Sequence, residues 1–365
     1  MHLRSGVLIT LQKCLLLVCS LLMCCPVGLS QQRYFYNDRN FGSEALYNPI
    51  SLILNGSYDI IQLDGHDRHI FNLPYGIATS NVLRNLGSPF GPISRYGWGN
   101  FLGDQIFPVH LAQKDAAWWP NYQLHLIGGG MTYTSIREWY TLHDFPVPTV
   151  LSLTTMAAYH LLNEFVENAG YVGDNVDPIA DIYVFDVGGV ILFSFDGVNR
   201  FFSEDLNLAD WSLQPSFTLT NVSLQNNGQY FSIRWKFPFS DRWHFFYYFG
   251  MNGLTGLSYK FPDHSAISFG AGLRAKNLVS VDSVIHKQTI NTIWNVGVFF
   301  DRENSLLASL FVSGLTDELV SLNVYPGLFN IGPVSPGVWF KVRKAGYVLA
   351  GITTVWTPGV ACTQK

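Results

Sequence analysis

A regular alternation of apolar and polar residues after Asn207 restricts the fold of this chain more than any other feature. In Ile267–Lys276 every second residue is apolar, and the residues between are serine, glycine or basic. Phe231–Phe237 and Ile290–Phe300 repeat this scheme. Because successive side chains of a strand point to opposite faces, a period of two indicates β-strands. We therefore predict antiparallel strands over residues 207–356, joined by short turns.

Alternation alone does not distinguish a membrane barrel from a soluble sandwich. Aromatic residues gather near the ends of the expected strands, as at Trp235, Trp356 and the run Trp243–Phe249. Charged residues make up 13% of the chain and aromatic residues 15%, and the charged share is about half of that in an average soluble protein. We therefore predict a mainly β fold with a helical insert, whose sheet is an antiparallel transmembrane β-barrel of about 10–12 strands. A soluble β-rich fold is the alternative.

Residues 1–30 have the features of a secretory signal peptide: a basic start, the apolar run Leu15–Met23 and small residues at the end. Cleavage there would leave Cys362 as the single cysteine, which excludes a disulfide framework within one chain and a thiolate metal cage. A lipid anchor on Cys24 or Cys25 is the alternative to cleavage. We predict export through this signal and a location in the outer membrane.

Residues 31–113 are rich in glycine, proline and asparagine. We predict a loop-rich region with extended stretches at Ile50–Asn55 and Tyr58–Leu63, and with an ordered aromatic loop over Phe90–Pro108. At the other end, residues 357–365 are predicted to form a tail after the last strand.

The period of the apolar residues becomes helical between 114 and 195. Prolines at helix starts and glycines at helix ends predict three helices, over Pro120–Tyr140, Pro148–Asn168 and Asp177–Phe195. Their uninterrupted apolar stretches are shorter than the roughly 20 residues of a membrane span. We predict that residues 114–195 form a buried, apolar three-helix insert before the barrel strands.

The first of these helices carries His125 on the same face as Gly128, Gly129 and Thr132. Glycines lower helix stability, so this face predicts the close approach of another helix or of a ligand. His125 is a candidate for proton transfer. The alternative is a core histidine that is hydrogen-bonded to a carbonyl group.

The second helix carries His160, Glu164 and Glu167 at steps of four and three residues, which places them on one face. Such a face could ligate a divalent cation, or place a general base beside a carboxylate. The alternative is a helix that becomes polar as it leaves the core.

The third helix carries three carboxylates. Asp177 precedes Pro178 and is predicted to be the N-cap, and Asp181 could compensate the helix dipole. Asp186 lies among apolar residues, where an unpaired carboxylate would be costly, so it must be paired, neutral or functional, and His125 is the candidate partner. The candidate catalytic residues are therefore His125, Glu164, Asp181 and Asp186. The candidate metal ligands are His160, Glu164 and Glu167, and no cofactor other than a divalent cation is expected.

The spacing of Glu164, Glu167, Asp177 and Asp181, followed by Asp186-Val-Gly188-Gly189, resembles a family of Gram-negative outer-membrane proteins that has no assigned reaction. In that family an acidic helical segment with a diglycine precedes a β-barrel, and the resemblance covers about residues 114–260. Glu164–Gly189 is also similar, more faintly, to VanZ-like membrane proteins, although no basic residue lies between Glu167 and Asp177 here. The resemblance implies an architecture and an outer-membrane location, and no activity.

Three functions are compatible with the sequence. The first is a structural or binding protein of the outer membrane, whose helices plug or underlie the barrel and contact lipid or an envelope partner. The second is an envelope enzyme that acts on lipid or glycan through the buried carboxylates and a histidine. The third, a passive channel, is disfavoured because the apolar insert needs a place to be buried. A net charge of −4 without a basic stripe excludes nucleic acid as an expected partner.

Overall fold

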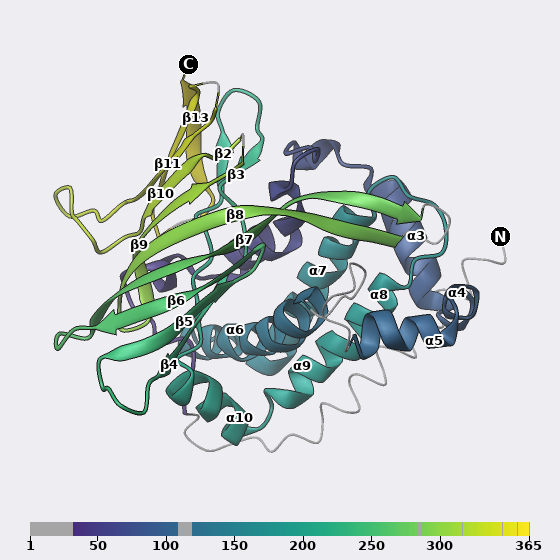
Figure 1. Ribbon diagram of the computed structural model, residues 1–365, viewed down its shortest axis with the longest axis horizontal. Coiled ribbons are helices and arrows are strands. Elements are labelled where there is room, and N and C mark those ends of the chain that lie inside the picture. Colours follow the sequence, from purple (N-terminus) through teal and green to yellow (C-terminus); the bar gives the residue numbers. More distant parts are fainter. Residues whose placement is uncertain are drawn as a thin grey trace.

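The computed structural model describes residues 32–108, 119–282, 287–315, 317–344, 346–355 and 357–364. A large curved sheet forms one side of the molecule, and helices lie against its concave face and beyond it (Figure 1). The predicted signal peptide, the start of the helical insert at 114–118 and the predicted strand end at Trp356 lie outside the described residues.

Three of the described α-helices, α3, α6 and α7, are longer than ten residues, and the others are short. In chain order the described α-helices are α2 (Pro49–Leu52), α3 (Tyr75–Gly87), α4 (Phe90–Tyr96), α5 (Trp98–Asn100), α6 (Gly130–Leu142), α7 (Pro148–Asn168), α8 (Asp177–Ala180), α9 (Val187–Leu192) and α10 (Asp196–Arg200). Tighter 3-10 turns are η1 (Ser43–Leu46), η3 (Asp59–Gln62) and η4 (Ile70–Asn72). Wider π-helical turns are η2 (Ile53–Ser57), η5 (Phe101–Ile106), η6 (Trp119–Gly129), η7 (Asp181–Asp186) and η8 (Phe201–Asp205).

The strands of the described chain form one sheet of 13 strands in the order β1-β4-β5-β6-β7-β8-β9-β10-β11-β12-β13-β2-β3. They are β1 (Ala209–Asp210), β2 (Ser216–Thr218), β3 (Leu224–Gln225), β4 (Phe231–Lys236), β5 (Trp243–Phe249), β6 (Asn252–Lys260), β7 (Ser265–Asp282), β8 (Lys287–Arg302), β9 (Ser305–Ser313), β10 (Val320–Val324), β11 (Gly337–Val342), β12 (Val348–Thr353) and β13 (Gly359–Gln364). Only the pairing of β13 with β2 is parallel among these strand pairs. The predicted strands over 231–237, 267–276 and 290–300 are confirmed.

The sheet is not closed into a barrel by its strand pairings, yet both of its ends belong to one chain segment. This segment begins at β1, which pairs with β4, and continues into β2, which pairs with β13. Between the two strands, the N–H of Trp211 donates to the carbonyl of Tyr230, and the N–H of Gly359 donates to the carbonyl of Pro215. Residues 209–218 therefore contact β4 near one edge of the sheet and β13 near the other edge.

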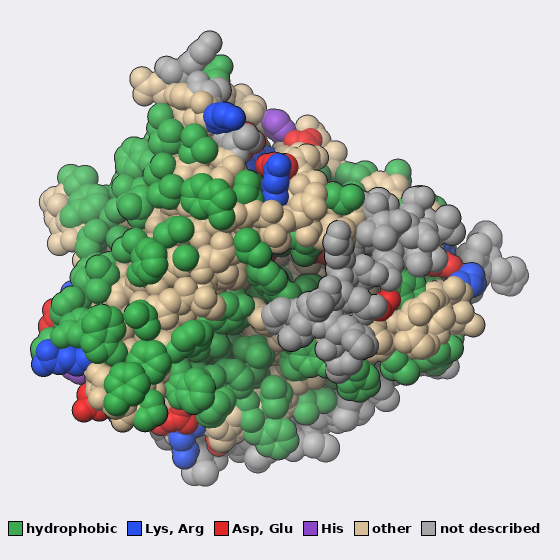
Figure 2. Space-filling view, in the orientation of Figure 1, with side chains coloured by type: hydrophobic (Ala, Val, Ile, Leu, Met, Phe, Trp, Pro, Cys, Tyr) green, Lys and Arg blue, Asp and Glu red, His purple; other side chains and the backbone are tan. Residues whose placement is uncertain are grey.

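Burial along the strands alternates in the opposite sense to that of an ordinary soluble sheet. On β7, Phe269 and Leu273 are 50% and 47% exposed. Their neighbours in the sequence, Ser268 and Arg274, are buried. The same holds on other strands, whose exposed apolar residues include Trp235, Leu257, Trp294, Val298, Leu310, Val312, Phe340, Ile352 and Val360. Figure 2 shows hydrophobic side chains covering the outer surface over the sheet.

The concave side of the sheet contains aromatic rings and paired charges. Trp211, Tyr248 and Phe299 pack together in the largest described cluster, with ring centroids 4.7–6.4 Å apart. Beside this cluster Arg234 forms a buried ion pair with Asp301, 2.6 Å apart. Pairing offsets much of the cost of burying these charges, and Arg234 also donates a hydrogen bond to Asn304.

The long hairpin β7–β8 extends beyond β6, which ends its pairing with β7 at Arg274. This extension arches over α7 (Figure 1). Its residues Ala275 and Leu278 pack with Val166 and Leu162 of that helix. The extension therefore joins the sheet to the helical part of the chain.

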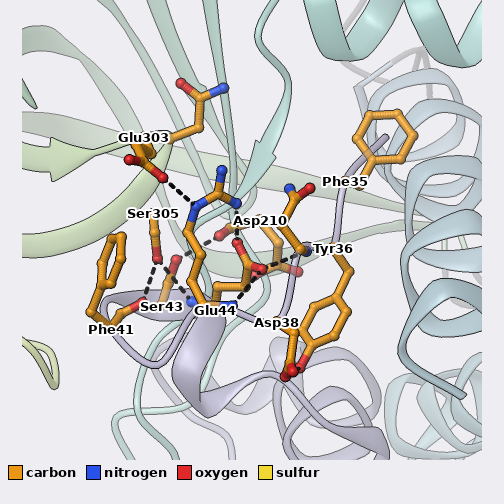
Figure 3. A network of polar contacts seen from close by, with 12 residues as sticks. Phe35, Tyr36, Asp38, Phe41, Ser43, Glu44, Asp210, Glu303 and Ser305 are labelled. Atoms are coloured by element: carbon orange, nitrogen blue, oxygen red, sulfur yellow. Dashed lines mark hydrogen bonds and ion pairs between the residues drawn. The ribbon is translucent and has the colours of Figure 1, made fainter. Parts of the chain in front are cut away.

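The N-terminal segment is fixed to the turn between β8 and β9 by a polar network (Figure 3). Arg39 contacts Glu44 and Glu303 at 2.7 and 3.1 Å, and the hydroxyl of Ser305 donates to the carbonyl of Phe41. Earlier in the segment, Glu138 of α6 accepts three backbone N–H groups, from residues 34–36. Residues 34–44 therefore belong to the folded body and do not form a free terminus.

The prediction of loops and extended stretches over 31–113 is wrong for residues 32–108, the part of this range that the structure describes. Ile50–Asn55 and Tyr58–Leu63 form helical turns, and Phe90–Pro108 is mostly helical. Asn48 caps α2 by accepting the N–H groups of Ile50 and Ser51, and Pro49 occupies the first turn. That Asn-Pro pair is the signal for a helix start that the sequence offered.

The predicted tail over 357–365 is also wrong, because it contains β13. Pro358 directly precedes this strand, and the residues after it pair with β12 and with β2. The three predicted helices are confirmed in position, although π-helical turns widen the first and third. No single described helix is long and apolar enough to cross a membrane; only the bent pair Asp177–Leu192 and Asp196–Asp205 passes by length and composition.

Candidate functional site

Two histidines meet one carboxylate where η6, α7 and η7 come together. The Nδ1 atom of His125 on η6 lies 3.0 Å from Oδ1 of Asp186 on η7, which confirms the expected pair. The Nδ1 atom of His160 on α7 lies 2.5 Å from the same oxygen. On the other side of its ring, Nε2 of His125 lies 3.5 Å from Oδ2 of Asp181. His125 therefore lies between two carboxylates, and Asp186 lies between two imidazoles.

Glycines bring these elements together. An added Cβ at Gly189 would lie 2.7 Å from the carbonyl oxygen of Leu126, and one at Gly130 would lie 2.8 Å from that of Gly189. Only a residue without a side chain allows two backbones to approach so closely. A Cβ at Gly129 would lie 3.3 Å from the ring of His160. A Cβ at Gly128 would lie 2.6 Å from the ring of Phe231 on β4. The predicted glycine face is thus occupied by a helix and a strand of the same chain, as the packing alternative held.

Two of the three elements that supply the site are π-helical. His125 lies in η6, and both Asp181 and Asp186 lie in η7. A π-helical turn is less favourable than an α-helical one and occurs often at functional sites. The wider turns direct these three side chains inward toward α7.

Five carboxylates lie close to the histidines, and most of them repel one another when ionised. They are Glu164, Glu167, Asp177, Asp181 and Asp186. Burial, followed by the charge of Asp181, raises the pKa of Glu164 well above its usual value. Burial and the charge of Asp177 raise the pKa of Glu167 to about 7. Burial likewise raises the pKa of Asp181, although His125 opposes that effect. These acids therefore resist ionising together.

Asp186 behaves in the opposite way. Burial would raise the pKa of its carboxyl, but His160 and His125 together hold that pKa below its usual value. Burial lowers the pKa of His125, but Asp181 and Asp186 outweigh it and raise this pKa to about 10. An ionised Asp186 beside a protonated His125 can hold and transfer a proton, as acid–base chemistry requires.

The cluster borders a cavity of about 440 Å³, which is within the usual size range of small-molecule sites. His125, His160 and Glu164 line it on the helical side, and Met251 and Leu278 line it on the side of the sheet. None of the described lining residues is a lysine or an arginine. The cavity therefore combines an acidic wall with an apolar one.

The predicted metal set of His160, Glu164 and Glu167 is not brought together, although all three line the cavity. Among the described residues, ligand atoms converge within 4.8 Å in two groups: His125, His160 and Asp186, and His125, Glu164 and Asp181. Residues seven positions apart on one helix are about 10 Å apart along its axis, and Glu167 belongs to neither converging group. The converging sets come from three helices, which helical periodicity does not reveal.

Asp177 has a different place from the one predicted. Val176 occupies the N-cap position of α8, and Asn175 accepts the backbone N–H of Asp177. The carboxylate of Asp177 instead lines the cavity. Asp59 of η3 also lines the cavity, and sequence reasoning missed it because its helical turn was predicted to be a strand.

Comparison of the chain with protein-family models, with curated proteins and with solved structures found no match.

Proposed function

We propose that this chain is an outer-membrane protein whose sheet is surrounded by lipid and whose helices fill the concave side. The sense of the alternation carries this proposal: apolar side chains on the outer face of the sheet are exposed, and the polar ones between them are buried. In water the favoured arrangement is the reverse, because burial of apolar surface drives folding. In hydrocarbon the outward apolar face is favoured.

The two ends of the sheet support closure in the membrane. Unpaired backbone groups at a strand edge are costly in hydrocarbon. Residues 209–218 already pair with β4 through β1 and with β13 through β2. We infer that this segment closes the sheet into a transmembrane barrel of about 10–12 spanning strands. The resemblance to Gram-negative outer-membrane proteins agrees with this location.

The helices then act as a plug with a binding cavity. Gln123 and Thr132 of the insert hydrogen-bond to Tyr247 and Gln229 of the β-rich part, at 2.6 and 3.0 Å. A helical layer joined to the sheet in this way disfavours a passive channel. The role that we propose is structural or ligand-binding, with outer-membrane lipid around the sheet, and with a lipid or an envelope partner at the cavity.

Extraction and refolding test the proposal. We expect the protein to fractionate with outer membranes, to require detergent during purification, and to refold when it is diluted from urea into detergent micelles or lipid vesicles. Refolding into buffer without detergent serves as the control and should give aggregates, because the exposed apolar face has no hydrocarbon around it. A folded, freely dissolved monomer in that buffer would refute lipid as the solvent of the sheet.

A second candidate function is an envelope enzyme that acts on lipid or glycan. His125 between Asp181 and Asp186, with buried Glu164 on the same cavity, favours it. In this role Glu164 is the general base and His125 is the proton partner. We expect Glu164→Gln and Asp186→Asn to reproduce the lipid mass spectrum of a deletion strain, whereas exposed Glu204→Gln does not. Wild-type spectra from both site variants would exclude the enzyme.

A further inference from the structure

We propose that His125, His160 and Asp186 form a binding site for one divalent transition-metal ion, with its open coordination position toward the cavity. Each residue offers one ligand atom, and these atoms lie within 4.8 Å of one another. The Nδ1 atoms of His125 and His160 lie 3.0 and 2.5 Å from Oδ1 of Asp186. They come from η6, α7 and η7. This inference does not depend on lipid around the sheet, so each proposal can fail without the other.

The contact between His160 and Asp186 points to a shared ion. Nδ1 of His160 lies 2.5 Å from Oδ1 of Asp186, yet both ring nitrogens of this buried histidine lack a partner with hydrogen-bond geometry. A buried polar atom without such a partner is costly and needs an explanation. An ion between the two atoms would supply it and would move them to about 3.3 Å, the edge of a tetrahedron with bonds of about 2.0 Å.

The donor set selects the class of metal. Two imidazole nitrogens and one carboxylate oxygen suit zinc, iron(II) and related ions, whereas calcium and magnesium prefer oxygen ligands. Three protein ligands leave a position for water or substrate, which is the arrangement of catalytic rather than structural sites. His125 and His160 both line the cavity, so that position faces the space where a ligand would bind.

Asp181 is a positioning residue in this site. Its Oδ2 atom lies 3.5 Å from Nε2 of His125, on the side of the ring away from Asp186. A carboxylate on the far nitrogen fixes the tautomer and the orientation of a metal-bound histidine. It leaves Nδ1 of His125 directed at the ion.

Glu164 and the charge of the site complete the argument. Glu164 is 1% exposed, and its Oε1 atom has no hydrogen-bond partner. It lies with His125 and Asp181 in the second converging group, within reach of a water molecule on the ion. Because no described lining residue is a lysine or an arginine, a divalent cation would compensate the acidic wall.

Metal binding to the full chain in detergent tests the site. After chelation and dialysis, calorimetry with Zn²⁺ should give one tight site per chain, and Co²⁺ should give the visible absorption of a four- or five-coordinate nitrogen–oxygen site. Mg²⁺ and Ca²⁺ should bind far more weakly than Zn²⁺. Failure of the wild-type chain to bind Zn²⁺ and Co²⁺ stoichiometrically, or a preference for Mg²⁺ or Ca²⁺, would overturn the proposal.

Variants locate the ion. We expect Asp186→Asn and His160→Gln each to weaken Zn²⁺ binding more than about 100-fold, and Asp181→Asn to weaken it by roughly 10–100-fold, as loss of an outer-shell carboxylate does. Glu167→Gln is the matched control, since Glu167 is an acid of the same cavity outside both converging groups. Equal losses in Glu167→Gln and Asp186→Asn would indicate general attraction to acids and refute the ligand set. Circular dichroism of each variant identifies any that fail to fold, and the wild-type Co²⁺ spectrum decides independently of them.

Discussion

Leu257→Arg is expected to destabilise the protein by about 2–4 kcal/mol in lipid vesicles, the range for a cation near the middle of a bilayer on a barrel strand. Leu257 lies in the middle of β6 and is 48% exposed. Its cross-strand neighbour on β7, Phe269, is exposed on the same face. If water surrounded this face, the same substitution would change the stability by only about 0.5 kcal/mol. The effect therefore reports which solvent covers the sheet.

Leu219→Arg is the matched control, because Leu219 is an exposed leucine in the turn between β2 and β3, outside the strands. A cation near the interface costs only about 0–1 kcal/mol. The measurement is a urea titration of both variants and of the wild type in phospholipid vesicles, followed by tryptophan fluorescence. Equal and small effects at the two positions would contradict a lipid-covered β6.

The strands could be predicted because their pattern is local. In β7 and β8 the alternation of apolar and polar residues assigns each side chain to one face of the strand. A few adjacent residues are therefore enough to identify the period of two. The sequence also predicted which face is apolar. It could not reveal that residues 209–218 contact both ends of the sheet, because the contact with β13 joins positions that are more than a hundred residues apart, such as Pro215 and Gly359.

Some helices could likewise be predicted from local sequence, and others could not. Proline at its start and Gly170 after its end predicted α7 with its observed limits, Pro148–Asn168. The turns α2, η2 and η3 each span four or five residues, which is too short for a helical period to appear. They are held by tertiary burial, with Ile61 fully buried in the cluster that also contains Val166, and such contacts override local propensity.

One part of the candidate site could be predicted from the cost of burying an unpaired charge. Asp186 needs a partner because a lone buried carboxylate is costly, and this argument identified His125. It did not identify His160 as a second partner, because the approach of α7 depends on Gly129 and on packing between helices. Helical spacing grouped His160 with Glu167, whereas the fold groups it with His125 and Asp186.

Glu318→Gln is expected to cost about 3–5 kcal/mol of unfolding free energy, because it leaves two buried cations without their counter-ion. Arg274 contacts Glu318 through two hydrogen bonds of 2.8 and 3.2 Å, and Lys341 contacts it at 2.9 Å. All three side chains are buried. The glutamine has nearly the same shape, so the loss isolates charge from packing.

The exposed pair of Lys236 and Asp241, 3.0 Å apart, provides the control. Asp241→Asn should cost less than about 1 kcal/mol, since water and salt screen exposed charges. Both variants are compared with the wild type by urea unfolding in detergent at low and high salt. The loss in Glu318→Gln should persist at high salt, because buried charges are screened little. A loss as small as that of Asp241→Asn would mean that water reaches Arg274 and Lys341, and the polar side of the sheet would then be a hydrated lumen instead of a packed interior.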